Sequence, residues 1–137
     1  MSFEVYFQRF KAGEMANFPK RDVEEVFGSA MVAEKRNFSF TPLAYPSGEA
    51  GDMHIADTEE ISGFTILDPA TDELFDDLFT LMKRIGAIVY WPDSAPCLAV
   101  ATKNIEADLP SDMLAALGPG ILVTSGRDIV MAIKGTL

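Results

Sequence analysis

Residues 68–86 have the sequence DPATDELFDDLFTLMKRIG, which predicts a helix over residues 69–85. Asp68 can cap its start, Pro69 fits the first helical position, and Gly86 ends it. Acidic residues near the beginning and basic residues near the end suit the two ends of the helix dipole. Apolar residues recur at helical spacing and form one stripe: Leu74, Phe75, Leu78, Leu81, Met82 and Ile85. Because such a stripe must be buried, we expect this helix to pack on a sheet.

Shorter apolar segments on both sides of this helix predict the strands of that sheet. Residues 3–10 alternate between apolar and polar positions, which is typical of a half-buried strand. Pro42 indicates that its own strand lies at an edge or carries a bulge, and PSGEAGD, residues 46–52, predicts a turn. Further strands are predicted at residues 38–45, 53–57, 61–67, 87–91, 97–102 and 121–124.

Three more helices are predicted at residues 19–28, 109–118 and 125–135, giving the order β-α-β-β-β-α-β-β-α-β-α. Runs of adjacent strands mixed with helices favour an α+β fold. We therefore expect a single domain over residues 1–137, with about four helices packed on a mainly antiparallel mixed sheet. A right-handed crossover can make one parallel pair from the last two strands.

The segment YWPDSAPCLAV, residues 90–100, contains the only tryptophan and the only cysteine. Its five central residues, PDSAP, have a normal length for a hairpin turn between two strands. Tyr90 and Trp91 are neighbours, so their rings point to opposite faces of the sheet. One ring belongs to the core, and the other is partly exposed. Hairpin packing is the simpler interpretation, with Trp91 as the candidate wall of a ligand groove.

The charge is strongly negative and unevenly distributed. The net charge is −10, and residues 49–77 contain ten acidic residues and no lysine or arginine. A field of this sign repels phosphate backbones, so we expect no nucleic-acid partner. Two interpretations remain: a surface that serves solubility, or a docking face for a cationic protein. The candidate docking residues are Asp72, Glu73, Asp76 and Asp77.

The expected cellular compartment follows from three features that the sequence lacks: a disulfide pair, a signal segment and a membrane-spanning run. A single cysteine cannot form an internal disulfide, and Glu4, Gln8 and Arg9 interrupt any apolar signal segment. No apolar run approaches the roughly 20 residues that span a bilayer. We therefore expect a cytoplasmic protein that has no membrane partner. It can be a monomer or a homodimer, since a free edge strand allows pairing without requiring it.

The residues for common catalytic chemistry are scarce. Structural zinc needs about four cysteine or histidine ligands, whereas this chain has one of each. His54 and Cys97 would form a dyad only if the fold brought them together, and nothing local enforces this. Val123 stands where a nucleophile elbow needs glycine. We name no catalytic residue, metal or cofactor; enzymatic activity stays undecided, with the sequence favouring a binding protein.

A second binding hypothesis concerns Ser125, Gly126 and Arg127 at a strand-to-helix turn. Free backbone N–H groups at a helix start can hold a phosphate or carboxylate. The alternative is plain capping by Ser125 with a solvated Arg127. The leading functional hypothesis is a small acidic interaction module, such as an immunity-type inhibitor of a cationic partner. The alternative is a small-molecule or anion-binding domain.

Overall fold

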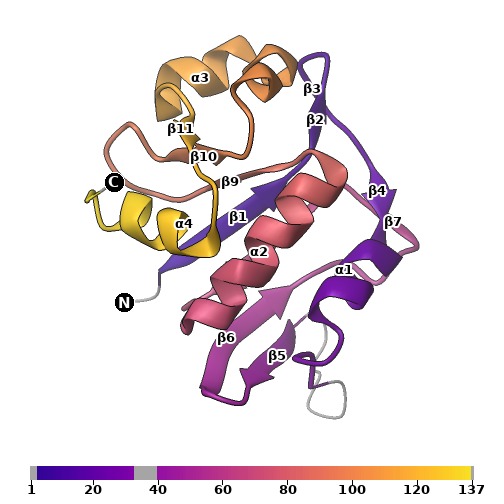
Figure 1. Ribbon diagram of the computed structural model, residues 1–137. Helices are drawn as coiled ribbons and strands as arrows, with labels where there is room; N and C mark the ends of the chain where they lie inside the picture. Colours follow the sequence, from indigo (N-terminus) through magenta and orange to yellow (C-terminus); the bar gives the residue numbers. More distant parts are fainter. Residues whose placement is uncertain (1–2, 33–39, 137) are drawn as a thin grey trace.

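The computed structural model describes residues 3–32 and 40–136, and it confirms the α+β fold class. A seven-stranded mixed sheet lies at its centre (Figure 1). The strands, in sheet order, are β11 (Ile121–Leu122), β10 (Leu98–Val100), β9 (Ile88–Tyr90), β1 (Glu4–Gln8), β8 (Gly63–Leu67), β6 (Gly48–His54) and β5 (Phe40–Tyr45). All neighbours are antiparallel except β10 and β11, which form the expected parallel pair.

Three helices cover one face of the sheet: α1 (Lys20–Phe27), α2 (Asp72–Ile85) and α4 (Gly126–Ile133). In Figure 1, α2 crosses in front of the sheet, with α4 beside it. The 3-10 helix η2 (Lys103–Asp108) and α3 (Ser111–Leu117) pack on the opposite face, only at its β9–β10 end. Within the described residues, no helix is both long and apolar enough to cross a membrane.

Two small ribbons lie outside the main sheet. Strand β2 (Phe10–Lys11) pairs with β3 (Glu14–Met15), and β4 (Phe18–Pro19) pairs with β7 (Glu60–Ile61). The first continues the chain beyond β1, and the second ties the start of α1 to the segment before β8. These short pairs divide two of the predicted strands into shorter pieces.

The main core lies between the sheet and the three helices. Val5 and Phe7 alternate inward along β1, and Phe7 stacks on Phe64 of β8 with ring centroids 4.7 Å apart. The predicted stripe of α2 is buried here, apart from Ile85, which is partly buried. Amphipathic packing of this helix on a sheet was therefore predicted correctly.

The start of α2 differs from the prediction. Helical residues begin at Asp72, and Thr71 is the cap, since its side chain accepts a hydrogen bond from the Leu74 N–H at 3.3 Å. Asp68 instead accepts a hydrogen bond from the backbone N–H of Phe3 at 3.0 Å. The end is as expected, because Gly86 adopts the left-handed conformation with φ of 69°.

The turn predicted at residues 46–52 is confirmed only at Pro46 and Ser47, which join β5 to β6, because residues 48–52 belong to strand β6. Gly51 has a φ of 103°, and a Cβ atom there would lie 2.4 Å from the Leu67 carbonyl oxygen. Glycine therefore lets β6 approach the end of β8 closely, where its turn-like composition had suggested a loop. Pro42 was interpreted correctly: β5 ends the sheet order, and its register shifts between Leu43 and Ala44.

Candidate functional site

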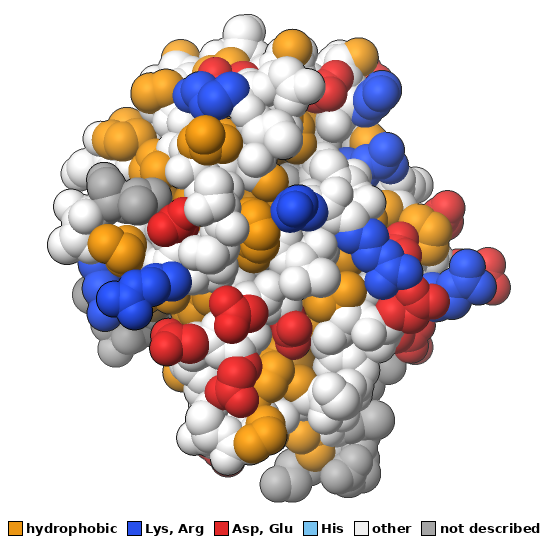
Figure 2. Space-filling model, viewed as in Figure 1, with side chains coloured by type: hydrophobic (Ala, Val, Ile, Leu, Met, Phe, Trp, Pro, Cys, Tyr) orange, Lys and Arg blue, Asp and Glu red, His pale blue; other side chains and the backbone are white. Residues whose placement is uncertain are grey.

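The four acidic residues singled out in the sequence lie along the first half of α2. Figure 2 shows acidic side chains gathered over this part of the molecule. Two of them hold the helix to the β5–β6 hairpin: Asp77 accepts a hydrogen bond from the Tyr45 hydroxyl at 2.6 Å, and Glu73 accepts one from Ser47. The other two are exposed. We call this set the α2 cluster: Asp72, Glu73, Asp76 and Asp77.

The carboxylates of the α2 cluster form no ion pair with any cation that the structure describes. Burial raises the pKa of Asp77, the Tyr45 hydrogen bond opposes this, and the charges of Asp76 and Glu73 raise it further. The cations form their ion pairs elsewhere, as Arg84 does with Asp22 at 3.2 Å. Among the residues that the structure describes, no ion pair involves the α2 cluster. Mutual repulsion within the cluster therefore persists in the folded protein.

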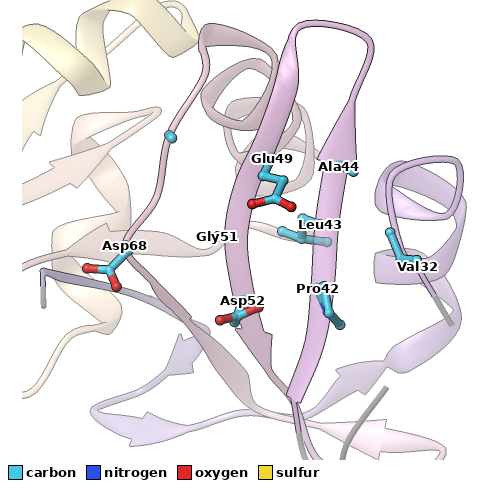
Figure 3. Close-up of a pocket in the computed structure, with 9 residues that line it drawn as sticks. Val32, Pro42, Leu43, Ala44, Glu49, Gly51, Asp52 and Asp68 are labelled. Carbon is cyan, nitrogen blue, oxygen red and sulfur yellow. The ribbon is translucent and has the colours of Figure 1, made fainter. Parts of the chain in front are cut away.

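A concave site lies beside the same hairpin, on the side of the sheet that faces away from α2 (Figure 3). Its volume is about 470 Å³, and we call it the acidic hollow. Its acidic lining residues are Glu49, Asp52 and Asp68, and its apolar lining includes Val32 and Pro42. Among the residues that the structure describes, no lysine or arginine lines it. The site therefore combines an apolar wall with several negative groups.

The rest of this sheet face carries a row of rings across five strands. The strand register places Phe40, His54, Thr65, Tyr6 and Tyr90 next to one another in that order. Phe40 stacks on His54 with centroids 4.7 Å apart, and Tyr6 stacks on Tyr90 at 5.0 Å. Thr65, with its short side chain, separates the two ring pairs. We call these five residues the aromatic row.

A second concave site, the central hollow, lies between the two ring pairs and has a volume of about 460 Å³. Besides His54, Tyr6 and Tyr90, it is lined by Gln8 and Gly63 among others. Helix α3 and η2 pack on this sheet face only over β9 and β10. The central hollow is therefore accessible from the uncovered part of the sheet.

The predicted anion site at Ser125, Gly126 and Arg127 has its polar groups engaged in capping. Ser125 Oγ accepts a hydrogen bond from the Asp128 N–H at 3.2 Å. Gly126 is buried against α2, where a Cβ atom would lie 2.4 Å from the Asp76 backbone nitrogen, while Arg127 is exposed. This geometry fits the capping interpretation, and it places the Asp76 and Asp128 carboxylates where an anion would be repelled.

The same turn is reinforced by Asp128. Its Oδ2 accepts hydrogen bonds from the Thr124 backbone N–H at 2.9 Å and the Thr124 hydroxyl at 2.8 Å. These two bonds hold the pKa of Asp128 below its usual value. The turn before α4 is thus organised around a carboxylate of its own.

Trp91 lies in the core with 1% of its surface exposed. It therefore cannot line a ligand groove unless the core opens, and Tyr90 is the partly exposed ring of the pair. The sequence showed that these rings face opposite ways but not which one faces inward. Tyr6, Thr65 and Tyr90 were missed because the signal is their cross-strand register, which joins segments far apart in the chain.

The one histidine and the one cysteine do not meet. His54 belongs to β6 and Cys97 precedes β10, and three strands of the sheet lie between. Burial raises the pKa of the Cys97 thiol, which disfavours the reactive thiolate. Within residues 3–32 and 40–136, no group of three histidine, cysteine or acidic residues is placed to hold a metal ion.

Comparison with known proteins finds no matching family model, no matching curated protein and no matching solved structure. Function must therefore be inferred from the residues of this chain.

Proposed function

We propose that this protein is an interaction module that binds a cationic protein partner through the carboxylates around its β5–β6 hairpin. The observation that carries the proposal is the acidic hollow, where Glu49, Asp52 and Asp68 lie beside an apolar lining and no lysine or arginine is found among the described lining residues. The α2 cluster extends the same negative surface on the helical side of the hairpin, to which Glu73 and Asp77 are hydrogen-bonded.

The composition of this hollow is complementary to a lysine or arginine side chain, which combines an apolar stem with a positive charge. The aliphatic stem of such a side chain can lie against Val32 and Pro42, while its charged head reaches the carboxylates. A surface that served only solubility would need charge but no apolar lining. The surrounding acidic residues would accelerate encounter with a positive surface and discriminate against acidic proteins. An immunity-type inhibitor of a cationic toxin is one instance of such a module.

The test uses a hexalysine peptide as the probe and follows the amide chemical shifts of isotope-labelled protein at low salt. We expect shift changes grouped at residues 48–52 and 68–77, weakening as salt is added. The double substitution Asp72→Lys, Asp76→Lys should weaken binding. Asp77 is left intact because its bond to Tyr45 supports the fold.

The matched control is the double substitution Glu14→Lys, Asp112→Lys. Both residues are exposed and lie on β3 and α3, away from the hairpin, and the net charge changes by the same amount. We expect the control to bind hexalysine almost as well as the unaltered protein. Equal weakening by the two double substitutions would show that only net charge matters, and it would refute the docking face.

A further inference from the structure

We infer that the central hollow receives the guanidinium group of an arginine side chain from the partner protein. This inference rests on the proposed function, because it names one side chain by which a cationic partner is held. It concerns a different set of residues, on the uncovered part of the sheet, so the two can be tested separately.

The charged residues of the sheet indicate which sign of charge the bound group carries. None of the seven strands contains a lysine or an arginine. Next to the aromatic row, the register aligns Pro42, Asp52, Leu67 and Glu4 on the same face. Carboxylates therefore lie beside the rings, with no cation on any strand to balance them. A cationic group complements this face, whereas a second copy of the same acidic face would be repelled.

The shape of the central hollow indicates a planar occupant. Tyr6 and Tyr90 stack with an interplanar angle of 28°, and on the other side Phe40 and His54 stack at 29°. Thr65 keeps the two ring pairs apart. A flat group that enters above Thr65 can lie against ring surfaces, and guanidinium stacks on aromatic rings in this way.

The floor of the central hollow offers oriented polar groups. Gln8 donates through Nε2 to the Ser62 carbonyl oxygen at 2.9 Å, which directs its Oε1 toward Gly63. Gly63 has to remain glycine, because a Cβ atom there would lie 2.2 Å from the Phe7 carbonyl oxygen. The Gln8 oxygen and the Thr65 hydroxyl therefore supply acceptors for the several N–H donors of a guanidinium group.

Glu4 does not line the central hollow, but its carboxylate is bound to Tyr6, which does. The Oε2 atom of Glu4 accepts a hydrogen bond from the Tyr6 hydroxyl. The second oxygen can accept from an incoming arginine, so Tyr6 would both stack on the guanidinium and orient its counterion. A lysine ammonium is compact and lacks the planar surface that the rings match. A nucleobase could also stack, but its phosphate would meet the repulsion of Glu4 and Asp52.

The experiment compares a tri-arginine peptide with a tri-lysine peptide, again by amide chemical shifts of labelled protein. We expect tri-arginine to shift Tyr6, Gly63, Thr65 and Tyr90 in addition to the acidic hollow. Tri-lysine should shift only the acidic hollow and the α2 cluster. Tyr6→Leu should weaken tri-arginine binding roughly tenfold and leave tri-lysine binding unchanged.

Two further variants provide a control and a second test of the same site. Phe79→Leu removes a partly buried ring from α2, on the other side of the sheet, and should bind both peptides normally. Thr65→Arg places an arginine side chain of this protein in the central hollow, so we expect it to prevent tri-arginine from binding there. This variant still tests the site if Tyr6→Leu fails to fold.

The outcomes separate the two proposals. Identical shift patterns for both peptides, confined to the acidic hollow and the α2 cluster, would overturn the arginine site and leave the docking face intact. Shifts at the central hollow alone, insensitive to Asp72→Lys and Asp76→Lys, would support the arginine site and refute the docking face. Absence of shifts from both peptides at low salt would overturn both.

Discussion

The two faces of strand β1 differ completely in what they contact. Val5 and Phe7 point into the core beneath the helices, and Phe7 has 2% of its surface exposed. Glu4, Tyr6 and Gln8 alternate with them and point to the uncovered face. One-sided burial is common in antiparallel sheets, and it is sufficient to hold a domain together. The covered face therefore accounts for folding, and the rings and carboxylates of the uncovered face need another explanation.

The β9–β10 end of the sheet strengthens this contrast. Here η2 and α3 cover the second face, and the residues beneath them are aliphatic: Ile88, Leu98 and Val100 are almost fully buried. Where no helix covers the sheet, the corresponding positions are mostly polar or aromatic, with tyrosine, histidine, threonine, glutamine and acidic residues, and the aliphatic Leu67 is an exception. The change in side-chain type follows the edge of the covering layer, so the uncovered area is a defined surface of the native protein.

The largest expected effect comes from removing a ring on each face of β1 in turn. Phe7→Ala should lower the free energy of unfolding by about 3–5 kcal/mol, because it leaves a cavity among Phe18 and Phe64. Tyr6→Ala, one residue away, should cost less than half as much. Urea unfolding measures both. Equal losses would mean that the uncovered face belongs to the folding core.

Gly126 tests how tightly the covering helices are packed together. Gly126→Ala places a methyl group 2.4 Å from the backbone nitrogen of Asp76, so α2 and α4 must separate. We expect a loss of about 1–3 kcal/mol, seen as a lower thermal midpoint. The neighbouring exposed residue provides the control: Arg127→Ala should change stability by about 0.5 kcal/mol or less. An unchanged thermal midpoint for Gly126→Ala would show that α2 and α4 can move apart at little cost in stability.

Tyr45→Phe tests the hydrogen bond between the hairpin and the α2 cluster. Burial raises the pKa of Asp77 in the folded protein, so its favourable contribution exists below its ordinary pKa and is lost as pH rises through the raised value. The Tyr45 hydroxyl limits this loss by stabilising the carboxylate. Its removal should cost about 1.5–3 kcal/mol near neutral pH and less in acid, where Asp77 is protonated.

Unfolding in urea at neutral and acidic pH measures this difference. The matched control is Tyr6→Phe, which also removes a hydroxyl that donates to a carboxylate, Glu4, but on the uncovered face. Solvent replaces that bond more easily, so we expect a smaller loss. A loss for Tyr45→Phe that does not change with pH would contradict the role given to Asp77.

The smallest effect is expected at Asp128, in the exposed turn before α4. Hydrogen bonds from Thr124 lower the pKa of Asp128, so its contribution is present above the ordinary pKa and disappears as pH falls through the lowered value. Asp128→Asn should therefore lower the thermal midpoint slightly at neutral pH and have no effect in strong acid. If the difference in thermal midpoint between Asp128→Asn and the unaltered protein grew as the pH fell, the pKa of Asp128 would be shifted in the opposite direction.

Local sequence signals predicted much of the fold. The stripe of α2 and its end at Gly86, the edge position of Pro42 and the parallel pair of the last two strands were all foreseeable. Each depends on residues that are close in sequence, or on a general rule of connection. The charge excess was equally visible, because it needs only the composition of residues 49–77.

The rest depended on contacts between distant segments. The Gly51 region has turn-like composition, yet it pairs as a strand because β8 approaches it closely. The inward position of Trp91 follows from how the hairpin meets the core, and η2 has no clear periodic signal. The aromatic row was not predictable, since residues from β5, β6, β8, β1 and β9 have to be brought into one register.

The absence of lysine and arginine from the sheet also determines how the protein can be cut. A protease that cleaves after basic residues has no site within any of the seven strands. The longest fragment between two such cleavage sites runs from Asn37 to Lys83, because no lysine or arginine lies between Arg36 and Lys83. Complete tryptic digestion therefore releases this segment as one fragment, which carries Glu49, Asp52 and Asp68 together with the α2 cluster.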